Sequence, residues 1–453
     1  MRSIRLVKNV VGGFLTRAVN LAGAAIVVPL AVGSLGTADY GYFAVVLSAA
    51  TFFAVADFGL GLALVNPVAV ADSEHETGKA RALISQVWFF LLAVAGTILI
   101  AGVATILLVH ATQWPGLLSK WPDAQTWLLL IVLVAAGLPS GLTQRVLFAL
   151  DRNYEANLWQ TAGRILVVAG SFLAYFCHLG RNGFILASLG LPALAGWIST
   201  VWLYLYSRPD LAPTVTQFSF RAVARNLPSG LRYLLLQVAQ FAELGLDVIL
   251  VASFLGAQQT ASFDLVTRLF NYIPGLTAIG IVPLWPAIAG AVARGEHAWV
   301  NKIESLSLMA VVGISLIPAA TLTFAAPYVV RLWTGVAVHY PVYLTAVLGL
   351  TAVLSSVGSL KTSVIMAKDG EKRLFTIQAV LLIILVAAKL VFLRLFGLLG
   401  LVMVTAILYA PRLFLYGQIL EEYKSGQVTV PADYGDNLRG AWRWVRTFRL
   451  EER

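Results

Sequence analysis

Long apolar segments recur along the whole chain, and they constrain its fold more than any other feature. A membrane-spanning helix requires about 20 mostly apolar residues, and twelve segments meet this requirement. They lie near residues 10–34, 41–70, 83–108, 125–144, 161–179, 184–206, 228–254, 262–290, 304–326, 341–366, 374–393 and 398–419. We therefore predict an all-α integral membrane protein with twelve transmembrane helices. The second segment is too long for one straight span, so we expect a bend or a protruding end.

The composition agrees with a membrane protein and excludes several other classes. Of the 453 residues, 59% are apolar and 12% are charged, whereas soluble domains contain about 25% charged residues. The net charge of +10 does not indicate nucleic-acid binding, because the basic residues are dispersed between apolar runs instead of forming one patch. The single cysteine, Cys177, excludes an intramolecular disulfide framework. Five scattered histidines do not indicate a metal site, and we expect no cofactor.

The distribution of basic residues predicts the orientation of the chain. Cytoplasmic loops of membrane proteins carry an excess of Lys and Arg. If the N-terminus is inside, the outer loops contain only Lys120, Arg181, Arg331 and Arg394. Most other basic residues outside the spans then fall on the inner side, among them Arg81, Arg145, Arg152 and Arg208. We therefore predict that both termini are cytoplasmic.

The two halves of the chain have similar connections. Each half contains six predicted spans that start inside, and four of the five loop lengths agree within two residues. The pair Leu35-Gly36 after the first span has a counterpart in Leu255-Gly256 after the seventh. We expect two six-helix lobes related by pseudo-two-fold symmetry, as in transporters whose substrate site lies between repeats. The predicted parts are an N-terminal lobe (1–206), a cytoplasmic linker (207–227), a C-terminal lobe (228–419) and a cytoplasmic basic amphipathic tail (420–453).

Ionisable side chains inside the spans are the candidate site residues. Such groups are costly in lipid and usually face a cavity, water or a partner charge. Arg17 lies deep in the first span, where it either faces a cavity or snorkels to the inner interface. Asp57 begins the sequence Asp57-Phe58-Gly59-Leu60-Gly61. Its two glycines permit a local break of the helix, so that the carboxylate faces a cavity, or permit close helix packing.

Two further pairs of charged residues have helical spacing. Glu243 and Asp247 are four residues apart and therefore share a helix face. Their repulsion raises the proton affinity of at least one, which suits an ion-coupling site, or one of them neutralises a basic residue elsewhere. Arg268 either pairs with Asp264 or offers its fixed donors to a phosphate group. Snorkelling is the cheaper explanation for the basic residues nearer the predicted span ends, namely Arg164, Arg232, Lys361, Lys389 and Arg412.

Two segments of the sequence resemble a known family. The stretch Leu35–Phe43, together with Asp57–Gly61, resembles the start of bacterial polysaccharide flippases, the O-antigen-type translocases of the multidrug/oligosaccharidyl-lipid/polysaccharide exporter superfamily. Ala252–Leu255 and Thr267–Gly275 look like spans 7 and 8 of the lipid II flippases of that superfamily. The resemblance implies a two-lobed bundle in the bacterial inner membrane. Such a bundle moves an undecaprenyl-diphosphate-linked oligosaccharide to the outer leaflet by alternating access, for O-antigen or exopolysaccharide biosynthesis.

The resemblance also implies roles for individual residues. In the lipid II relatives, one arginine in span 1 and one in span 8 hold the diphosphate, and these match Arg17 and Arg268 here. This sequence departs from those relatives at Ala18, where they carry an aspartate, and it lacks their extra pair of spans. Coupling to a proton or Na⁺ occurs in parts of the superfamily. We also expect association with a polysaccharide polymerase or ligase.

Two alternative functions have distinct sequence requirements. A multidrug or cation antiporter of the same superfamily would bind cations through Glu243, Asp247 and Asp57, and the arginines within the spans argue against it. A membrane glycosyltransferase or oligosaccharide polymerase would be an enzyme, and the short outer loops argue against it. The sequence contains no phosphate-binding G-x-x-x-x-G-K-[ST] loop and no H-E-x-x-H motif, so we predict a transporter that does not hydrolyse nucleotides.

Overall fold

The computed structural model describes residues 2–112, 122–293, 295–368 and 371–424, and within these residues it contains helices and no strand. The predicted tail from residue 425 onward lies outside the described residues. The α-helices are α1 (Arg2–Phe53), α2 (Leu60–Ala63), α3 (Val65–Ser73), α4 (Thr77–Thr112), α5 (Ala124–Ala149), α6 (Asn153–Phe176), α7 (Gly180–Ile185), α8 (Leu191–Val201), α9 (Phe220–Leu244), α10 (Leu246–Leu255), α11 (Ala257–Ala293), α12 (His297–Thr334), α13 (Val342–Ala367) and α14 (Glu371–Lys424).

Many of these helices are long enough to cross a membrane. By length and apolar composition, seven helices among the described residues qualify, or eight if the bent pair α9 and α10 forms one span. The two longest, α1 and α14, each contain a kink at a glycine, Gly36 and Gly397 respectively, and each kink falls between two predicted spans. The structure therefore confirms an all-helical membrane protein, while the count of twelve spans and the sidedness of the termini stay predictions.

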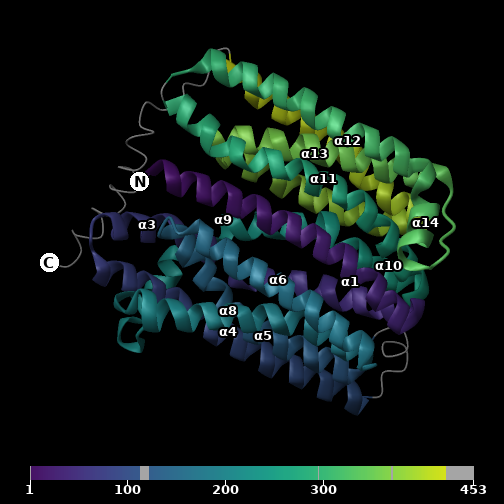
Figure 1. Cartoon of the computed structure of the whole chain (residues 1–453), viewed down its shortest axis with the longest axis horizontal. Coiled ribbons are helices and arrows are strands. Elements are labelled where there is room, and N and C mark those ends of the chain that lie inside the picture. Colours follow the sequence, from purple (N-terminus) through teal and green to yellow (C-terminus); the bar gives the residue numbers. More distant parts are fainter. Residues whose placement is uncertain (1, 113–121, 294, 369–370, 425–453) are drawn as a thin grey trace. The chain divides into compact units, whose positions relative to one another are not determined.

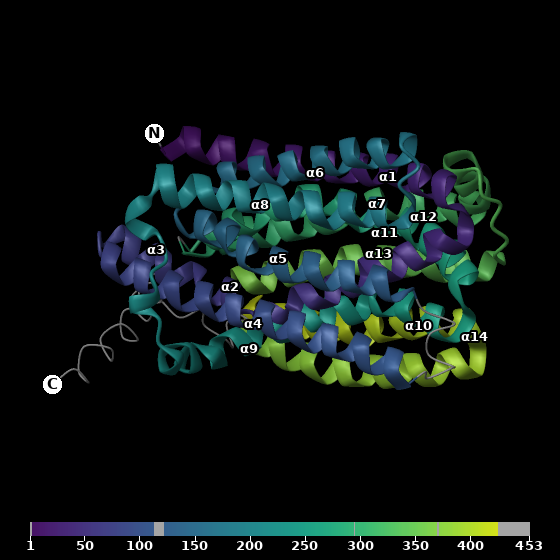
Figure 2. The same cartoon turned by 90° about the horizontal axis from the view of Figure 1, so that it is seen from below.

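Contacts divide the helices into two compact units. Unit 1 contains the chain up to Val266 together with Pro327–His339, and unit 2 contains Thr267–Ala326 and the chain from Tyr340 onward. In unit 1, α1 lies alongside α6, α4 packs against α5, and α8 contacts both α5 and α6 (Figures 1 and 2). In unit 2, α13 packs against α14. This division into units does not test the predicted lobes, which the linker at 207–227 separates, so the lobes stay a prediction.

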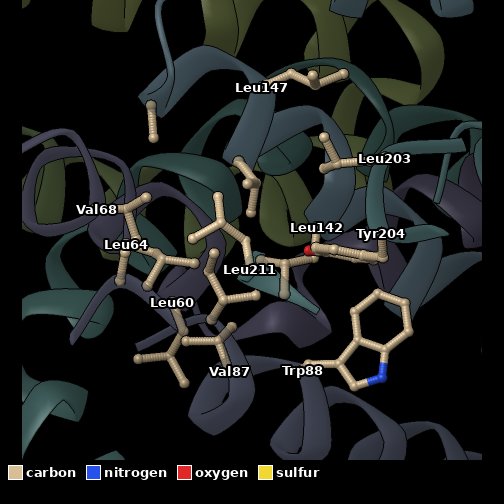
Figure 3. Packing of buried hydrophobic residues seen from close by; sticks show 14 of the residues in the cluster. Leu60, Leu64, Val68, Val87, Trp88, Leu142, Leu147, Leu203, Tyr204 and Leu211 are labelled. Carbon is tan, nitrogen blue, oxygen red and sulfur yellow. The ribbon is translucent and has the colours of Figure 1, made fainter. Parts of the chain in front are cut away.

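The core of unit 1 is a cluster of buried apolar side chains from α2, α3, α4, α5 and the end of the sixth predicted span (Figure 3). Trp88 of α4 makes edge-to-face contacts with Trp197 and Tyr204, with ring centroids 5.9 and 5.8 Å apart. Leu211, which belongs to the predicted linker, is completely buried in the same cluster. Burial of this apolar surface holds the broken second span and the start of the linker against α4 and α5.

Polar contacts fix the linker as well. Arg208 forms ion pairs with Asp72 at 2.9 Å and with Asp210 at 2.8 Å. Arg81 donates through Nε to the carbonyl oxygen of Ala212 at 2.7 Å. The hydroxyl of Ser85 accepts a hydrogen bond from the backbone N–H of Thr214 at 3.0 Å. The predicted linker is therefore tied to α3 and α4 over its first half.

The two matching Leu-Gly pairs, Leu35-Gly36 and Leu255-Gly256, have the same backbone conformation at their glycines. Gly36 has φ 72° and ψ 176°, and Gly256 has φ 87° and ψ 172°, which only glycine adopts readily. The segments that follow these two glycines are in contact, because a Cβ atom added at Gly41 would lie 2.0 Å from the carbonyl oxygen of Ala257. Next to them, the buried hydroxyl of Tyr40 donates to Asp264 at 2.7 Å. The local repeat seen in the sequence is thus also a structural repeat.

The predicted bend of the second span is confirmed and lies at Asp57-Phe58-Gly59. Phe58 and Gly59 are both left-handed, with φ 52° and 68°. A Cβ atom at Gly59 would lie 2.2 Å from the carbonyl oxygen of Gly230, and one at Gly230 would lie 2.6 Å from that of Phe58. The break therefore rests directly on the backbone of α9, and neither glycine can carry a side chain without a shift of one helix.

Gly59→Ala tests this contact. The substitution adds a left-handed alanine, which costs about 1–2 kcal/mol by itself, and a clash with Gly230. We expect a clearly lower apparent melting temperature of the purified protein in detergent. Gly78→Ala in α4 is the control, because a Cβ atom there meets nothing within 4 Å. Equal melting temperatures for the two variants would contradict the proposed backbone contact.

The ion pairs of the linker predict a dependence of stability on acid pH. The hydrogen bond from Arg208 lowers the pKa of Asp210. A lowered pKa contributes stability above the unfolded pKa of about 3.9, and this contribution is lost as the pH falls through the folded pKa. The melting temperature of Asp210→Asn should therefore fall less between about pH 5 and pH 3 than that of the wild type. The control Glu421→Gln should change this fall less than Asp210→Asn does. The effect is small because Asp210 is partly exposed. An unchanged acid profile would count against this role of the pair.

Candidate functional site

Asp57 lies at the helix break and is held there by a backbone hydrogen bond. Its Oδ1 atom accepts the backbone N–H of Gly59 at 2.8 Å. The side chain of Gln237, on α9, and the backbone of Gly61 also lie close to this carboxylate. The first helical segment ends at Asp57, and the chain changes direction at Phe58. The carboxylate of Asp57 therefore lies beside a helix end and not within a continuous helix.

Arg145 faces this carboxylate from α5. It is half-buried and close enough for a direct attraction to Asp57. A Cβ atom at Gly61 would lie 3.0 Å from Oδ2 of Asp57 and 3.5 Å from Cγ of Arg145, so both side chains converge on this glycine. The lack of a side chain at position 61 leaves room for the two charged groups.

The sequence analysis missed Arg145, because it assigned the residue to an inner loop that starts after residue 144. The structure shows that α5 continues to Ala149. A signal for this was present, since Leu142, Val146 and Ala149 repeat at the spacing of a helix face and all three are buried. The prediction of an inner-loop position for Arg145 was wrong.

A cavity of about 470 Å³ opens beside Asp57 and Arg145 within unit 1. Its polar lining also contains Ser140 and Gln144 of α5 and Gln160 of α6. The amide of Gln160 donates through Nε2 to Oε1 of Gln144 at 2.9 Å, which connects the two helices across the wall. Gln160 was another residue assigned to a loop in the sequence analysis, whereas α6 begins at Asn153.

The rest of the wall is apolar or lacks side chains. The glycines in it are Gly61, Gly137, Gly141 and Gly196. A Cβ atom at Gly141 would meet nothing within 4 Å, so it would point into open space. The segment Leu186–Gly190 just before Pro192 is a π-helix, and Leu189 and Pro192 line the cavity. Such π-helical turns are frequent at functional sites.

The chemistry of this lining is polar and balanced. One carboxylate, one guanidinium, two amides and one hydroxyl supply both donors and acceptors. Placing charges away from water costs several kcal/mol for each ion, and the attraction between Asp57 and Arg145 reduces that cost. Among the described residues, no group of three or more His, Cys, Asp and Glu side chains is placed to hold a metal ion.

Arg17 lies on α1 in the segment that packs against α6. Its neighbour Thr16 is buried and shares a hydrogen bond of 2.9 Å with Thr161. Asn20 accepts from Nε of Arg164 at 2.8 Å, so Arg164 bonds across a helix interface, and its snorkelling stays a prediction. Arg17 itself is half-buried, and its contact with substrate stays a prediction.

Glu243 and Asp247 do not lie on one unbroken helix, contrary to the sequence analysis. The chain breaks at Gly245, and α9 and α10 meet there at an angle of 44°. A Cβ atom at Gly245 would lie 2.6 Å from the ring of Phe241, so this position requires glycine. The two carboxylates therefore lie on opposite sides of a bend, and Oδ1 of Asp247 is buried. Their role in ion coupling stays a prediction.

Arg268 is half-buried on α11 and belongs to unit 2. Asp264, one turn earlier, accepts from Tyr40 through Oδ2, so this carboxylate has a partner other than Arg268. Contact between Arg268 and substrate stays a prediction.

Basic residues of the last three predicted spans are also directed into the protein. Lys389 is completely buried, so the prediction that it snorkels was wrong. The guanidinium of Arg412 lies over the rings of Tyr409 and Tyr416, 5.3 and 5.6 Å from their centroids. The ammonium of Lys361 donates to the carbonyl oxygen of Leu413 at 3.4 Å. Unit 2 therefore contains cationic side chains within its helices.

Solved transporters share this fold. An inward-facing multidrug resistance MATE family transporter of the MOP superfamily is 15% identical over 91% of this chain and 99% of its own, with a TM-score of 0.69. An outward-facing transporter of that family is 14% identical over 93% and 96%, with a TM-score of 0.62. A MOP superfamily transporter from Pyrococcus furiosus, described as having a binding pocket of reverse polarity, is 14% identical over 93% and 96%, with a TM-score of 0.61.

These likenesses establish a MATE-like transporter fold in a multi-pass membrane protein. Among functionally curated proteins, none matches the chain at a significant level. The family model of polysaccharide biosynthesis proteins matches residues 6–292, which is more than half of the chain. The chain therefore belongs to the polysaccharide biosynthesis protein family.

Proposed function

We propose that this protein is a flippase for lipid-linked oligosaccharides. It moves an undecaprenyl-diphosphate-linked glycan from the inner to the outer leaflet of the bacterial inner membrane, for polysaccharide biosynthesis such as that of O-antigen or exopolysaccharide. The observation that carries this proposal is the match to the polysaccharide biosynthesis family over residues 6–292 in a chain with a transporter fold. A polysaccharide pathway requires a transporter for its polar, membrane-attached precursor, and a chain with this fold is suited to that task.

The head group of this substrate sets the physical task. A diphosphate–sugar head group cannot cross hydrocarbon alone, because each buried charge costs several kcal/mol. Guanidinium groups replace the hydration of a phosphate with fixed donors. We assign this task to Arg17 and Arg268, which each bind the diphosphate during the transport cycle while the polyprenyl tail stays in lipid. Both side chains are half-buried within helices, as this role requires.

The transport cycle follows from the fold. Relatives with this fold have been solved in inward-facing and outward-facing conformations, and we propose that this chain alternates between two such states. The bend at Gly245 provides a position where α9 and α10 change their angle. Glu243 and Asp247 flank this bend, and binding of a proton or Na⁺ to them would bias the equilibrium between the states. We also propose association with a polysaccharide polymerase or ligase, which would use the exported glycan.

Ion-coupled export of cationic drugs is the second candidate function, because several solved structures with this fold are multidrug resistance transporters. Such a site would use carboxylates, among them Asp57, Glu243 and Asp247. In unit 1, however, Arg145 faces Asp57 beside the cavity and repels a cationic ligand. The Pyrococcus furiosus transporter is described as having a binding pocket of reverse polarity, so pocket charge differs between proteins with this fold.

Arg268→Ala should abolish export of the glycan, and Arg268→Lys should keep part of it, because lysine retains the charge without the planar donor pattern. The measurement is surface polysaccharide in a strain that lacks the native gene and carries each variant at equal protein level. Arg331→Ala is the control, since Arg331 lies in the exposed last turn of α12 and should export normally. Full export by Arg268→Ala would remove Arg268 from the substrate site.

A dye-accumulation assay separates the flippase from the antiporter. Cells that produce the protein should accumulate cationic dyes to the same level as cells that produce no transporter, within experimental error. In the same strains, loss of the protein should cause lipid-linked oligosaccharide to build up in the inner leaflet. Energy-dependent dye export, together with normal polysaccharide in the deletion strain, would decide in favour of the antiporter.

A further inference from the structure

We propose that the cavity of unit 1 is a binding site for a neutral sugar residue of the glycan, separate from the arginines assigned to the diphosphate. This inference rests on the proposed flippase function and names the part of the substrate that this cavity takes. It is carried by the juxtaposition of Asp57, Arg145, Gln144 and Gln160 around an open space of about 470 Å³. This volume is within the range of roughly 300–1,000 Å³ that is typical of small-molecule sites.

The charge of the lining selects the class of ligand. Asp57 repels the diphosphate and Arg145 repels a cation, whereas the pair together carries no net charge. A neutral ligand with many hydroxyl groups suffers neither repulsion. It also uses both partners, because a hydroxyl group donates to the carboxylate and accepts from the guanidinium. A sugar ring is the neutral, hydroxyl-rich part of the proposed substrate.

The amides extend this pattern along the wall. The bond between Gln160 and Gln144 uses one N–H of Gln160 and the carbonyl oxygen of Gln144. The NH₂ group of Gln144 and the carbonyl oxygen of Gln160 then supply one further donor group and one further acceptor to the cavity. The spacing of donors and acceptors across α5 and α6 is fixed by this bond, which is the kind of preorganisation that favours one arrangement of hydroxyl groups over another.

The glycines provide the space that a ring requires. Gly137 and Gly141 lie one turn apart on α5, whereas Gly196 on α8 makes room for Ser140, whose Oγ atom would lie 2.7 Å from an added Cβ atom. At Gly141 an added Cβ atom meets nothing within 4 Å, so helix packing does not require glycine there. An empty volume next to a polar cluster is explained if it is occupied by a ligand during transport.

The polar end of the cavity also lies on the side where the substrate is made. Asp57, Gln144, Arg145 and Gln160 gather near the C-terminal end of α5 and the start of α6. In the predicted orientation this end faces the cytoplasm, and lipid-linked oligosaccharides are assembled on that side in the proposed function. The apolar end, at Leu133 and Val134, lies deeper.

The test compares two lipids bound to the purified protein in detergent. One is undecaprenyl diphosphate, and the other is the lipid-linked oligosaccharide fraction from the membranes of the source organism, with bound lipid quantified by mass spectrometry. The wild type should prefer the glycan-linked lipid by about tenfold or more, which corresponds to a few hydrogen bonds. Gly141→Leu fills the cavity and should reduce this preference to within about twofold, without weakening the binding of undecaprenyl diphosphate.

Two further variants keep the test decisive. Gln160→Leu keeps the volume of the side chain but removes its hydrogen bonds, and it should reduce the preference even if Gly141→Leu fails to fold. Gly96→Leu is the matched control, because Gly96 of α4 also has open space around it but does not line the cavity, and it should behave as the wild type. A preference that both cavity variants retain, or no preference in the wild type, would overturn the sugar site. Failure of the wild type to bind either lipid would instead refute the flippase function.

Discussion

The backbone contact between Gly59 and Gly230 is the constraint on which the site of unit 1 depends. With neither residue carrying a side chain, the break after Asp57 lies directly on α9, and a Cβ atom at either position would lie within 2.6 Å of a carbonyl oxygen of the other segment. The break turns the chain, and the N–H of Gly59 then holds the carboxylate of Asp57. Gln237 of α9 also lies close to it. Two glycines thus place Asp57, which is the one carboxylate among the described residues of the cavity lining.

The charged residues of unit 1 fall into two kinds according to what they contact. Arg208 is satisfied by two carboxylates at the linker, and Arg181 of α7 bonds Asp39 of α1 and Asp123 at the start of α5. These ion pairs join helix ends and are complete without a ligand. Asp57 and Arg145 differ, because they lie within spans, beside an open volume with additional amides. A charged pair kept in such a place, where apolar packing would cost less, is better explained by binding than by stability.

Much of the fold was predictable, because membrane spans are long apolar segments and because glycines at kinks have a specific backbone requirement. The break at Asp57-Phe58-Gly59 and the junctions at Gly36 and Gly256 follow from these signals. Interior charges were less predictable. Arg145 was not predicted as a site residue because the predicted span ended at residue 144, although the apolar face of the helix continues to Ala149. The break at Gly245 was missed because Glu243 and Asp247 have helical spacing, and spacing alone does not reveal a bend.

A lipid-linked glycan has two chemically different polar parts, and this explains why one set of side chains does not suffice. In the proposed function the anionic diphosphate is assigned to the donors of Arg17 and Arg268, whereas the sugars are neutral and require donors and acceptors in balance. A transporter must release its substrate on the outer side, so its affinity for the substrate must differ between the two states. A cavity with excess positive charge would hold the diphosphate too tightly for this release. A balanced cavity for the sugar adds recognition without adding charge. Under the two proposals made above, selectivity for the glycan and movement of the carrier are set by separate residues, so either one can change without loss of the other.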